Sequence, residues 1–348
     1  MIKKSSKQSQ RLNEAQDVVQ VDKQKYVLAL DNGTQSIRAL LFDLNGELVA
    51  KSKIDIEPYF SKQPGWAEQE PNYYWKMLAK ACNYLWPELA ILKIKKSQIK
   101  AVSLTCQRAT MINLDRKGQP LRPAFVWLDQ REQNTLDKMS WHWRALFTLA
   151  GEKQTIDYFR SQAEANWIKH QQPDIWEKTY KFMLLSGFHS FKLTGNYVDS
   201  ISSQVGYLPF NFKQHTWSKP LDWRWQALPI KKEMLPKLIP CGDELGIISE
   251  QAAIDTGIPL GLPLISAGSD KACEVLGSGC LTPQTGSLSY GTTATYNTTN
   301  TKYVEAIKRL PAYPAAMPKT FNTEIIVQRG YWMVSWFKRE FGLKEQQI

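Results

Sequence analysis

The chain has 348 residues, 43% of them hydrophobic, and a formal net charge of +11 at pH 7. This length allows one large domain or two ordinary ones, with enough apolar residues to bury a sizeable core. Lysine and arginine are spread along the chain without an arginine-rich block or a zinc-finger, RRM or KH signature, so we expect no nucleic-acid partner. A lysine-rich solvated surface explains the charge best, and attraction for small polyanions such as nucleotides is the alternative.

Cysteine usage and the N-terminal residues bear on the cellular compartment. The five cysteines are widely spread and include no C-x-x-C pair, so the sequence indicates neither a disulfide framework nor a zinc site. Residues 1–24 form a polar tail without the apolar region of a signal peptide, and no apolar run in the chain is long enough to cross a bilayer. We therefore expect a cytoplasmic protein with no membrane partner.

The segment YVLALDNGTQSIRALLFDLNGELVA, residues 26–50, begins the ordered part of the chain. Two β-type runs, at 27–30 and 37–42, flank a small polar loop. The turn signal Asp-Leu-Asn-Gly-Glu at 43–47 then precedes a third run at 48–56. This pattern predicts a three-stranded antiparallel meander, not a strand followed by a helix.

The loop of the first hairpin carries Asp31, Gly33, Thr34, Gln35 and Arg38. It matches neither G-x-x-x-x-G-K-[ST] nor G-x-G-x-x-G, the two phosphate-binding patterns that open a helix. Gly33 lets the backbone approach a ligand, and Thr34 and Gln35 add hydrogen-bond donors. Asp31 can hold a magnesium ion through its waters, and Arg38 can complete the charge balance. The alternative, which these residues alone favour, is a plain hairpin turn at Asn32-Gly33 with Asp31 as its cap.

A second informative segment is GLPLISAGSDKACEVLGSG, residues 261–279. An apolar run at 262–267 is followed by Gly-Ser-Asp and then by a short helical pattern that ends at Gly277. Asp270 therefore lies where a strand gives way to a helix. The helix N-terminus favours an ionised carboxylate, which is the state that a general base requires. The alternative is that Ser269 or Asp270 is simply the helix N-cap.

The segment GSLSYGTTATYNTTN, residues 286–300, again places strand-like residues around a small turn. Its Gly291-Thr292 pair echoes the Gly33-Thr34 pair of the first hairpin. We interpret the two as related phosphate-binding hairpins, one in each half of the protein. A threonine-rich edge hairpin without a ligand is the alternative.

In this order, the segments resemble the FGGY carbohydrate kinase family of the actin-like ATPase superfamily, from about Tyr26 to the C-terminus. Two further stretches carry the resemblance, PGWAEQEPNYYW at 64–75 and VSLTCQRATMINLDRKGQPLRPAFVWLDQRE at 102–132. The resemblance implies an α/β fold of the ribonuclease H-like type, with a mixed β-sheet flanked by helices. It assigns residues 25–280 to the substrate domain and 281–348 to the beginning of an incomplete second, nucleotide-binding domain of the same type.

The resemblance also assigns roles to individual residues. It implies a first phosphate-binding loop formed by Gly33, Thr34, Gln35 and Arg38, in which Asp31 binds Mg²⁺. It implies a second phosphate-binding loop formed by Gly291 and Thr292. It makes Asp270 the catalytic base and places Gln107, Arg108 and Lys271 against the sugar. The implied cofactors are ATP and Mg²⁺, the implied partner is a sugar or polyol substrate, and a homodimer is compatible with the family.

One position departs from the glycerol kinases of this family. They follow the matching arginine with a glutamate, whereas this chain has Ala109. The departure disfavours glycerol and favours another polyol or a sugar.

Three functional classes stay open on the sequence. The first is an ATP-dependent sugar kinase. The second is a truncated, catalytically impaired sugar-binding remnant or fragment, because the glycine-rich adenosine motif of the family is not found before Ile348. The third is a non-kinase actin-like protein, which would not need the Gly-Trp-x-Glu-Gln and Gln-Arg segments.

The remaining residues with chemical potential give weaker predictions. Trp66, Trp75 and Trp127 are candidates to face the sugar, although core packing is the better interpretation for most of the 13 tryptophans. The four histidines have no ligand spacing and are interpreted as structural or surface residues. The proline-rich stretch 310–322 is predicted to cross the surface, and residues 325–342 to restart ordered structure.

Overall fold

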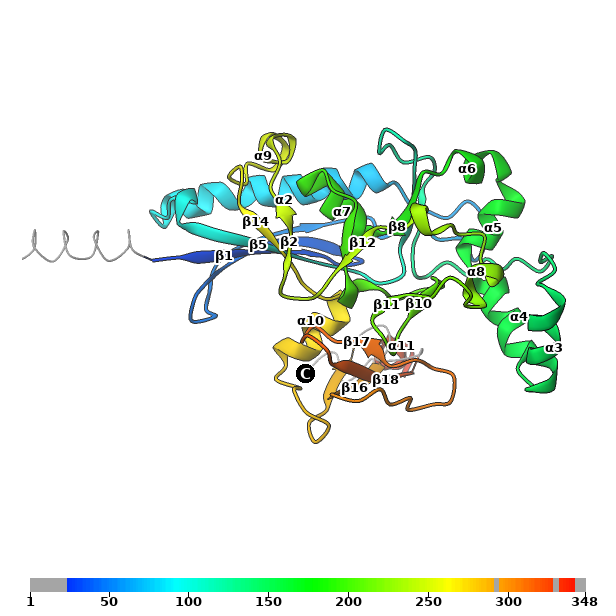
Figure 1. The fold of residues 1–348 in the computed structure, drawn as a ribbon. Coiled ribbons are helices and arrows are strands. Elements are labelled where there is room, and N and C mark those ends of the chain that lie inside the picture. The colour runs from blue at the N-terminus through cyan, green and yellow to red at the C-terminus, as the bar shows by residue number, and fades with distance from the viewer. Residues whose placement is uncertain (1–23, 291–293, 328–331, 342–348) are drawn as a thin grey trace, which may run out of the picture.

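The computed structural model describes residues 24–290, 294–327 and 332–341 (Figure 1). Its centre is a six-stranded mixed sheet. In spatial order the strands are β13 (Glu244–Ile247), β14 (Pro263–Ser266), β5 (Ile99–Cys106), β1 (Tyr26–Asn32), β2 (Ser36–Asp43) and β3 (Leu48–Asp55). Strands β14, β5 and β1 are parallel neighbours, whereas β1, β2 and β3 form the antiparallel meander that the sequence predicted.

Local sequence explains this meander. Residues of β1 alternate between buried and half-buried positions, as expected for a strand with one face on the core. In the turn between β2 and β3, the Asp43 carboxylate accepts the backbone N–H groups of Asn45 and Glu47 at 2.8 and 3.0 Å. Gly46 supplies the positive φ of 88° that closes this turn.

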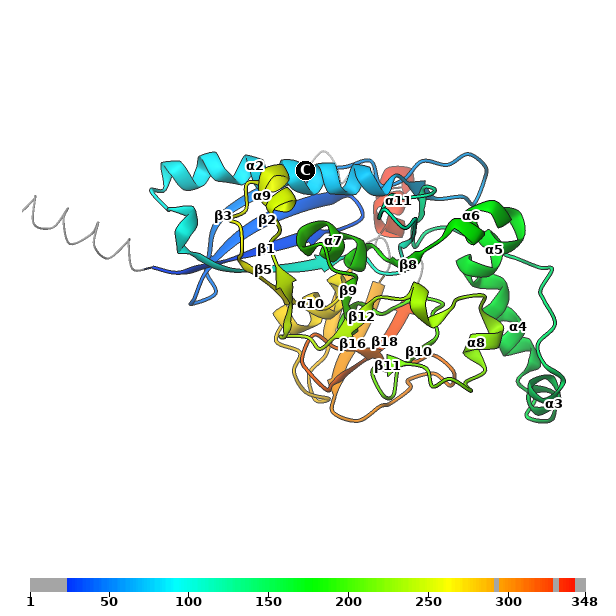
Figure 2. The same cartoon turned by 45° about the horizontal axis from the view of Figure 1, so that its top comes forward.

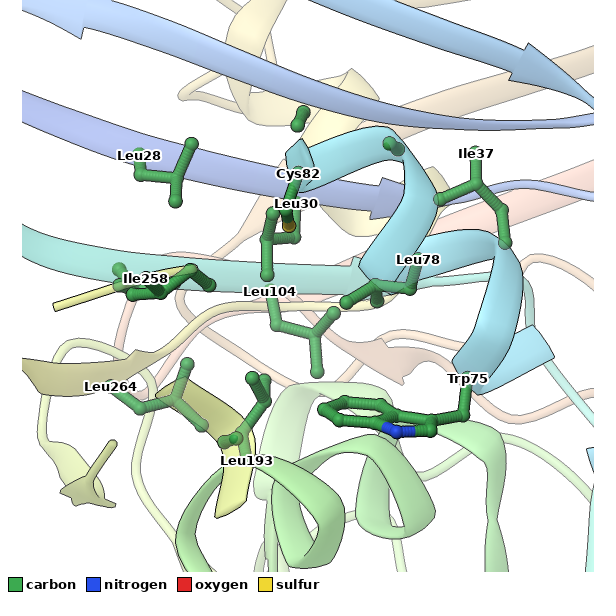
Figure 3. Close-up of a cluster of buried hydrophobic side chains, with 14 of the residues drawn as sticks. Leu28, Leu30, Ile37, Trp75, Leu78, Cys82, Leu104, Leu193, Ile258 and Leu264 are labelled. Carbon is green, nitrogen blue, oxygen red and sulfur yellow. The ribbon is translucent and has the colours of Figure 1, made fainter. Parts of the chain in front are cut away.

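Three helices cover one face of the sheet: α2 (Pro71–Ile91), α7 (Leu185–Thr194) and α9 (Glu250–Thr256) (Figure 1). Helix α2 begins with Pro71, which is tolerated in the first helical turn because no backbone bond is lost there. Figure 3 shows the resulting core, where Leu30 and Leu104 of the sheet meet Leu78 of α2 and Leu193 of α7.

A second hydrophobic core lies toward the end of the molecule where Figure 1 labels α3 to α6. One small sheet here has the order β4 (Glu68–Gln69), β7 (Ala124–Phe125), β6 (Met111–Leu114) and β8 (Lys181–Leu184). The helices of this part are α3 (Trp141–Leu149), α4 (Lys153–Gln162), α5 (Glu164–Gln171), α6 (Pro173–Lys178) and α8 (Arg224–Ala227). Two strand pairs complete it, β9 (Val198–Ser200) with β12 (Lys237–Ile239) and β10 (Phe210–Asn211) with β11 (Thr216–Trp217). Short 3-10 turns occur at Lys96–Gln98, Ile201–Ser203 and Lys232–Met234.

The C-terminal part of the chain forms a separate four-stranded sheet. After α10 (Asp270–Gly277), its order is β15 (Ser287–Tyr290), β16 (Ala294–Asn300), β18 (Phe321–Val327) and β17 (Tyr313–Pro314), and α11 (Trp332–Phe341) follows. Figures 1 and 2 both show this second sheet on the side of the main sheet opposite α2. The chain therefore returns to ordered structure after the proline-rich stretch, as predicted.

The proline-rich stretch itself differs from its prediction. Pro314 lies in the edge strand β17, where its missing N–H removes no central ladder bond. Ala312, Ala315 and Ala316 are buried, and Ala316 packs against Ala272 of α10. The stretch thus forms an edge strand of the second sheet and packs its alanines toward α10, so it does not simply cross the surface.

Within the described residues, no helix combines the length and the apolar character that a membrane span requires.

Candidate active site

The parallel part of the main sheet brings the predicted functional residues to one edge. Asp31 lies near the carboxyl end of β1, Gln107 and Arg108 follow β5, and Asp270 follows β14. Since these three strands are parallel and adjacent, their carboxyl ends meet at the same edge, which is where open α/β sheets bind ligands. Segments separated by more than 200 residues thus converge on one region.

The first hairpin loop is built around an ion pair between its two strands. Asp31 and Arg38 are register partners, and the Arg38 guanidinium donates to the Asp31 carboxylate at 2.7 Å. The Gly33 N–H donates to the Ser36 carbonyl at 3.1 Å, which makes the turn tight. Burial raises the pKa of Asp31, and the nearby Arg38 partly opposes this shift. The loop leaves Gln35 exposed and Gly33 half-buried, so ligand atoms can approach it.

The stretch at 102–132 contacts this loop through Trp127. Its indole N–H donates to the Thr34 hydroxyl at 2.9 Å, and its side chain is 39% exposed. Trp66 and Trp75, the other two candidates to face a sugar, instead belong to the two cores. The Trp75 indole N–H donates to Asp255 at 2.8 Å. Of the three tryptophans, Trp127 is therefore the one that the structure brings to the first loop.

A buried contact that the sequence did not indicate supports the end of β1. The fully buried side chain of Asn32 bonds to His189 of α7 at 2.8 Å, and its amide also donates to the Gly33 carbonyl at 3.1 Å. Because the Asn32 nitrogen faces the loop, its oxygen accepts from the imidazole N–H of His189. Burial lowers the pKa of His189 to about 3, so the ring is neutral. The histidine was predicted to be structural, and this contact is consistent with that role.

Gln107 is held from two directions. Its backbone N–H donates to the Asn32 carbonyl at 2.8 Å, and its side-chain amide donates to the Tyr74 hydroxyl at 2.9 Å. The side chain is 3% exposed, yet its carbonyl oxygen has no hydrogen-bond partner among the described residues. A buried unpartnered acceptor is costly, so this oxygen is a candidate to accept a hydrogen bond from a bound ligand.

Arg108 joins the main sheet to the second sheet. Its guanidinium donates to the Glu324 carboxylate of β18 at 3.0 Å and lies 5.5 Å from the ring centre of Tyr313. Glu324 is almost completely buried, with 1% of its side chain exposed. Neither partner was found by sequence reasoning, because nothing in the local pattern of an acidic residue on a strand points to a distant arginine.

Asp270 occupies the first position of α10, while Ser269 is the N-cap. The Ser269 hydroxyl accepts the N–H of Ala272 at 3.4 Å, and the Asp270 carboxylate accepts the N–H of Lys271 at 2.7 Å. Burial raises the pKa of Asp270 to about 6, against the lowering effect of Arg108. The negative charge of Asp31 raises it further. The capping role therefore belongs to Ser269, and Asp270 is a largely buried carboxylate with a raised pKa.

The remaining predicted residues are Lys271, Gly291 and Thr292. The Lys271 ammonium pairs with Glu274 at 2.8 Å, one turn along α10. Gly291 and Thr292 lie outside the described residues, although the strands β15 and β16 on either side of them do pair as an antiparallel hairpin.

The stretches 64–75 and 102–132 contact each other through buried ion pairs. Glu68 accepts hydrogen bonds from Arg122 and, at 3.0 Å, from Arg131. Arg131 also pairs with Asp129 at 2.6 Å and packs 4.1 Å from the ring of Trp66. These buried charges are mutually paired, and they fix the segment that carries Trp127.

The residues present are compatible with magnesium bound through phosphates and water. Within the described part of the chain, no group of three or more His, Cys, Asp or Glu side chains could hold a metal ion. Mg²⁺, however, is usually held by one or two carboxylates together with phosphate oxygens and water. The charge of Asp31 contributes to the raised pKa of Asp270, so the two carboxylates lie near each other and fit that requirement.

Comparisons with solved structures define the class of the fold. The chain superposes on gluconate kinase from Lactobacillus acidophilus with a TM-score of 0.74 and 21% identity, covering 91% of this chain and 62% of that one. For Plasmodium falciparum glycerol kinase with ADP, the TM-score is 0.71 at 20% identity, with 91% and 64% covered. The fold is that of carbohydrate kinase structures, an α/β fold with a mixed sheet flanked by helices.

Comparison with sequence relatives also finds carbohydrate kinases. Xylulose kinase from Lactococcus lactis subsp. lactis is 24% identical over 317 residues, covering 91% of this chain and 62% of the relative. Glycerol kinase from Thermococcus gammatolerans is 29% identical over 265 residues, covering 68% and 51%. The chain thus spans between about half and two thirds of the length of these relatives. The family model for the N-terminal domain of the FGGY family of carbohydrate kinases matches residues 26–277, and the chain belongs to this family.

Proposed function

We propose that the protein transfers the terminal phosphoryl group of ATP to a hydroxyl of a sugar or polyol, with Asp270 as the general base. The observation that carries this proposal is the convergence of the Asp31 loop, Gln107, Arg108 and Asp270 at the carboxyl edge of β1, β5 and β14. Phosphoryl transfer requires mainly that an acceptor hydroxyl be aligned with the γ-phosphate while charge is neutralised. Backbone amides, a cation and one carboxylate suffice for that chemistry.

Asp270 would take the proton of the acceptor hydroxyl. With a pKa of about 6, its carboxylate is mostly ionised at neutral pH and is a stronger base than an exposed aspartate. Arg108 would hold the acceptor near this carboxylate, and the free oxygen of Gln107 would accept a hydrogen bond from a substrate hydroxyl. Lys271 would contribute only if its ammonium left Glu274.

The phosphate side of the site would use the two hairpins. The loop at Gly33, Thr34 and Gln35, together with the exposed guanidinium of Arg38, would bind the phosphates from one side, and the turn with Gly291 and Thr292 would bind them from the other. Asp31 would hold Mg²⁺ through its waters, and the bound ion would neutralise charge on the phosphates. The boundary between the substrate domain and the start of the nucleotide domain would lie near residue 280, after α10.

The acceptor is proposed to be a sugar or a polyol other than glycerol. Ala109 offers only a methyl group at the position after Arg108, so it cannot accept a hydrogen bond from a small triol. Its φ of 47° places it in the left-handed region, directly after the Arg108 that pairs with Glu324 of the second sheet.

The test is sugar-dependent ADP release by the product of the full reading frame, with Mg²⁺ present and a panel of sugars and polyols. We expect turnover of roughly 1 to 100 per second with the preferred acceptor, and a sugar phosphate in equal amount to the ADP. Calorimetry on the 348-residue chain should show that it binds the same acceptor. Binding without ADP release would favour the sugar-binding alternative, and the absence of both would contradict the proposal.

A further inference from the structure

A buried carboxylate that the proposed reaction does not use lies in strand β9. Asp199 is 1% exposed. Its carboxylate accepts hydrogen bonds from the Ser186 hydroxyl at 3.0 Å, the Ser200 backbone N–H at 2.8 Å and the Gln204 amide at 2.8 Å. Burial raises the pKa of Asp199 to about 7, although these hydrogen bonds oppose the rise.

No cation compensates this buried charge. None of the ion pairs that the described residues form includes Asp199. Burying a carboxylate without a cation costs free energy, and an apolar residue would not incur that cost. The position therefore calls for a role beyond packing.

On one side, Asp199 is anchored to the main sheet through helix α7. Ser186 and Gly187 lie in the first turn of α7, which has no side-chain cap of its own. A Cβ atom at Gly187 would lie 3.2 Å from a carboxylate oxygen of Asp199, so the missing side chain allows this close approach. Helix α7 in turn packs on the main sheet, where Leu193 shares a core with Leu104 (Figure 3). The carboxylate is thus fixed relative to the strands that carry the site.

On the other side, Asp199 holds the 3-10 turn Ile201–Ser203. Ser200 and Gln204 flank this turn, and both donate to the Asp199 carboxylate. The Gln204 amide also donates to the Ser200 carbonyl at 2.9 Å. One carboxylate therefore holds the turn at both of its ends.

The turn presents Ser202 to the helix that carries the proposed base. The Ser202 carbonyl accepts the N–H of Ser269, the N-cap of α10, at 3.0 Å. Asp270 follows directly as the first residue of that helix. The Ser202 hydroxyl donates to the carbonyl of Ala315, the residue after strand β17, at 2.6 Å. Ser202 is thus held from two sides, and the backbone that enters Asp270 is bonded to it.

We propose that Asp199 is a positioning residue for the transfer reaction, which acts through the 3-10 turn and Ser202 to place Asp270. It contacts neither the acceptor nor the phosphates. The inference rests on the proposed kinase function, in which Asp270 is the base. A displacement of about 1 Å at a reacting group can lower a rate on the order of 100-fold, so a small movement of Ser269 is enough to matter.

Hydrogen exchange in the 348-residue chain tests the structural step without any substrate. Asp199→Asn keeps the shape of the side chain, but in either orientation its NH₂ group meets a donor where the carboxylate offered an acceptor. By mass spectrometry, we expect amide exchange at least about tenfold faster in peptides covering 199–204 and 267–271, with no change in β2. Unchanged exchange at 267–271, or an equal increase in β2, would contradict the positioning role.

Kinetics of the product of the full reading frame test the step from position to catalysis. With ATP and acceptor saturating, Asp199→Asn should lower kcat about 10- to 100-fold, while acceptor affinity by calorimetry changes less than about threefold. The double variant with Asp270→Asn should be no slower than Asp270→Asn alone. The reason is that a positioning residue has no effect once the group that it places is lost.

Ser202→Ala and Ser190→Ala form a matched pair. Both serines are buried, and each donates to a backbone carbonyl, but Ser190 bonds within its own helix, to Ser186 at 2.9 Å. Ser202→Ala should lower kcat about tenfold and Ser190→Ala should leave it unchanged, with similar losses of stability. Equal kcat values in the two variants would contradict the proposal. This pair carries the test if Asp199→Asn does not fold.

The outcomes separate the two levels of the proposal. A parent without sugar-dependent ADP release would contradict the kinase function, and hydrogen exchange would still decide whether Asp199 fixes the start of α10. An active parent, alongside a folded Asp199→Asn variant with parental kcat, would overturn the positioning role alone. Losses that multiply in the double variant would overturn it as well, since Asp199 would then act independently of Asp270.

Discussion

The side chains of Asn32 and His189 bond to each other at 2.8 Å and are both completely buried, which connects the end of β1 to helix α7 beneath the first hairpin loop. The same asparagine donates to the Gly33 carbonyl. A neutral histidine thus helps to fix the backbone of a loop that is proposed to bind phosphate. This is a positioning role, since the imidazole itself is covered by core residues.

The first prediction concerns His189 and acid stability. Its pKa is lowered to about 3 by burial, whereas in the unfolded chain it is near 6.5, so below that pH the unfolded state binds a proton that the folded state does not. The contribution of His189 to the free energy of unfolding should therefore fall as pH decreases from about 6.5 toward 3. Glutamine in His189→Gln keeps a hydrogen-bond donor for Asn32 but does not titrate. Between pH 8 and pH 5, the free energy of unfolding of this variant should therefore decrease by about 2 kcal/mol less than that of the parent. Urea unfolding at both pH values measures this difference.

His189→Leu is the companion variant, since it removes the donor. It should cost about 1 to 3 kcal/mol at neutral pH because the Asn32 oxygen loses its partner. It should also weaken ATP binding, while His189→Gln should not. Equal ATP affinity in both variants would show that the histidine has no influence on the loop.

The second prediction concerns Asp270 and the pH dependence of stability between about pH 4 and 6. Its pKa of about 6 in the folded protein lies above the ordinary value of 3.8, so the folded state is penalised as the carboxyl group ionises. The contribution of Asp270 to the free energy of unfolding should therefore decrease as pH rises from about 4 to 6. Asp270→Asn cannot ionise and should be more stable than the parent by about 3 kcal/mol near pH 7.5, with the advantage close to zero near pH 3.5.

This comparison of variant and parent isolates one carboxyl group from the other titrating groups. Unfolding is measured by circular dichroism across the pH series. An advantage that does not change with pH would indicate that Asp270 is solvated and has an ordinary pKa.

The third prediction concerns the ion pair of Arg108 and Glu324. Arg108→Met leaves a buried carboxylate without its partner and should destabilise the protein by about 3 to 5 kcal/mol. The double variant Arg108→Met with Glu324→Gln should recover part of this loss, and a double-mutant cycle gives the coupling energy.

An exposed pair provides the control. Lys53 and Asp55 are 54% and 81% exposed, so Lys53→Met should change stability by less than about 1 kcal/mol. Additive effects in the Arg108 and Glu324 cycle would mean that the two side chains do not interact in solution, and that the second sheet is not held to the main sheet at this point.

The parts of the fold that the sequence predicted are those encoded locally. Alternating burial and the Asp43 to Glu47 turn determine the meander, and the change from an apolar run to a helical pattern determines where Asp270 lies. The order of segments then indicated the family. Each of these signals spans a few neighbouring residues, so each could be interpreted without knowing the tertiary structure.

The remainder depends on contacts between distant segments. Arg108 and Glu324 are 216 positions apart, and their pairing follows from how the second sheet packs on the main sheet. Likewise, His189 and Asn32 are 157 positions apart, and their contact follows from how α7 packs near the end of β1. Trp66 and Trp75 were candidates for sugar contact because aromatic faces suit sugars, but the same faces also suit hydrophobic cores, where both residues lie.

The fourth prediction is the catalytic effect of Asp270→Asn, which tests the central claim most directly. It is measured as sugar-dependent ADP release by the product of the full reading frame, with ATP and the preferred acceptor both saturating. As a general base, Asp270 should contribute roughly 100- to 10,000-fold to kcat, so the variant should bind both substrates, unfold cooperatively and lose activity by that factor. A folded variant that keeps more than about a tenth of the parental kcat would contradict the assignment of Asp270 as the base.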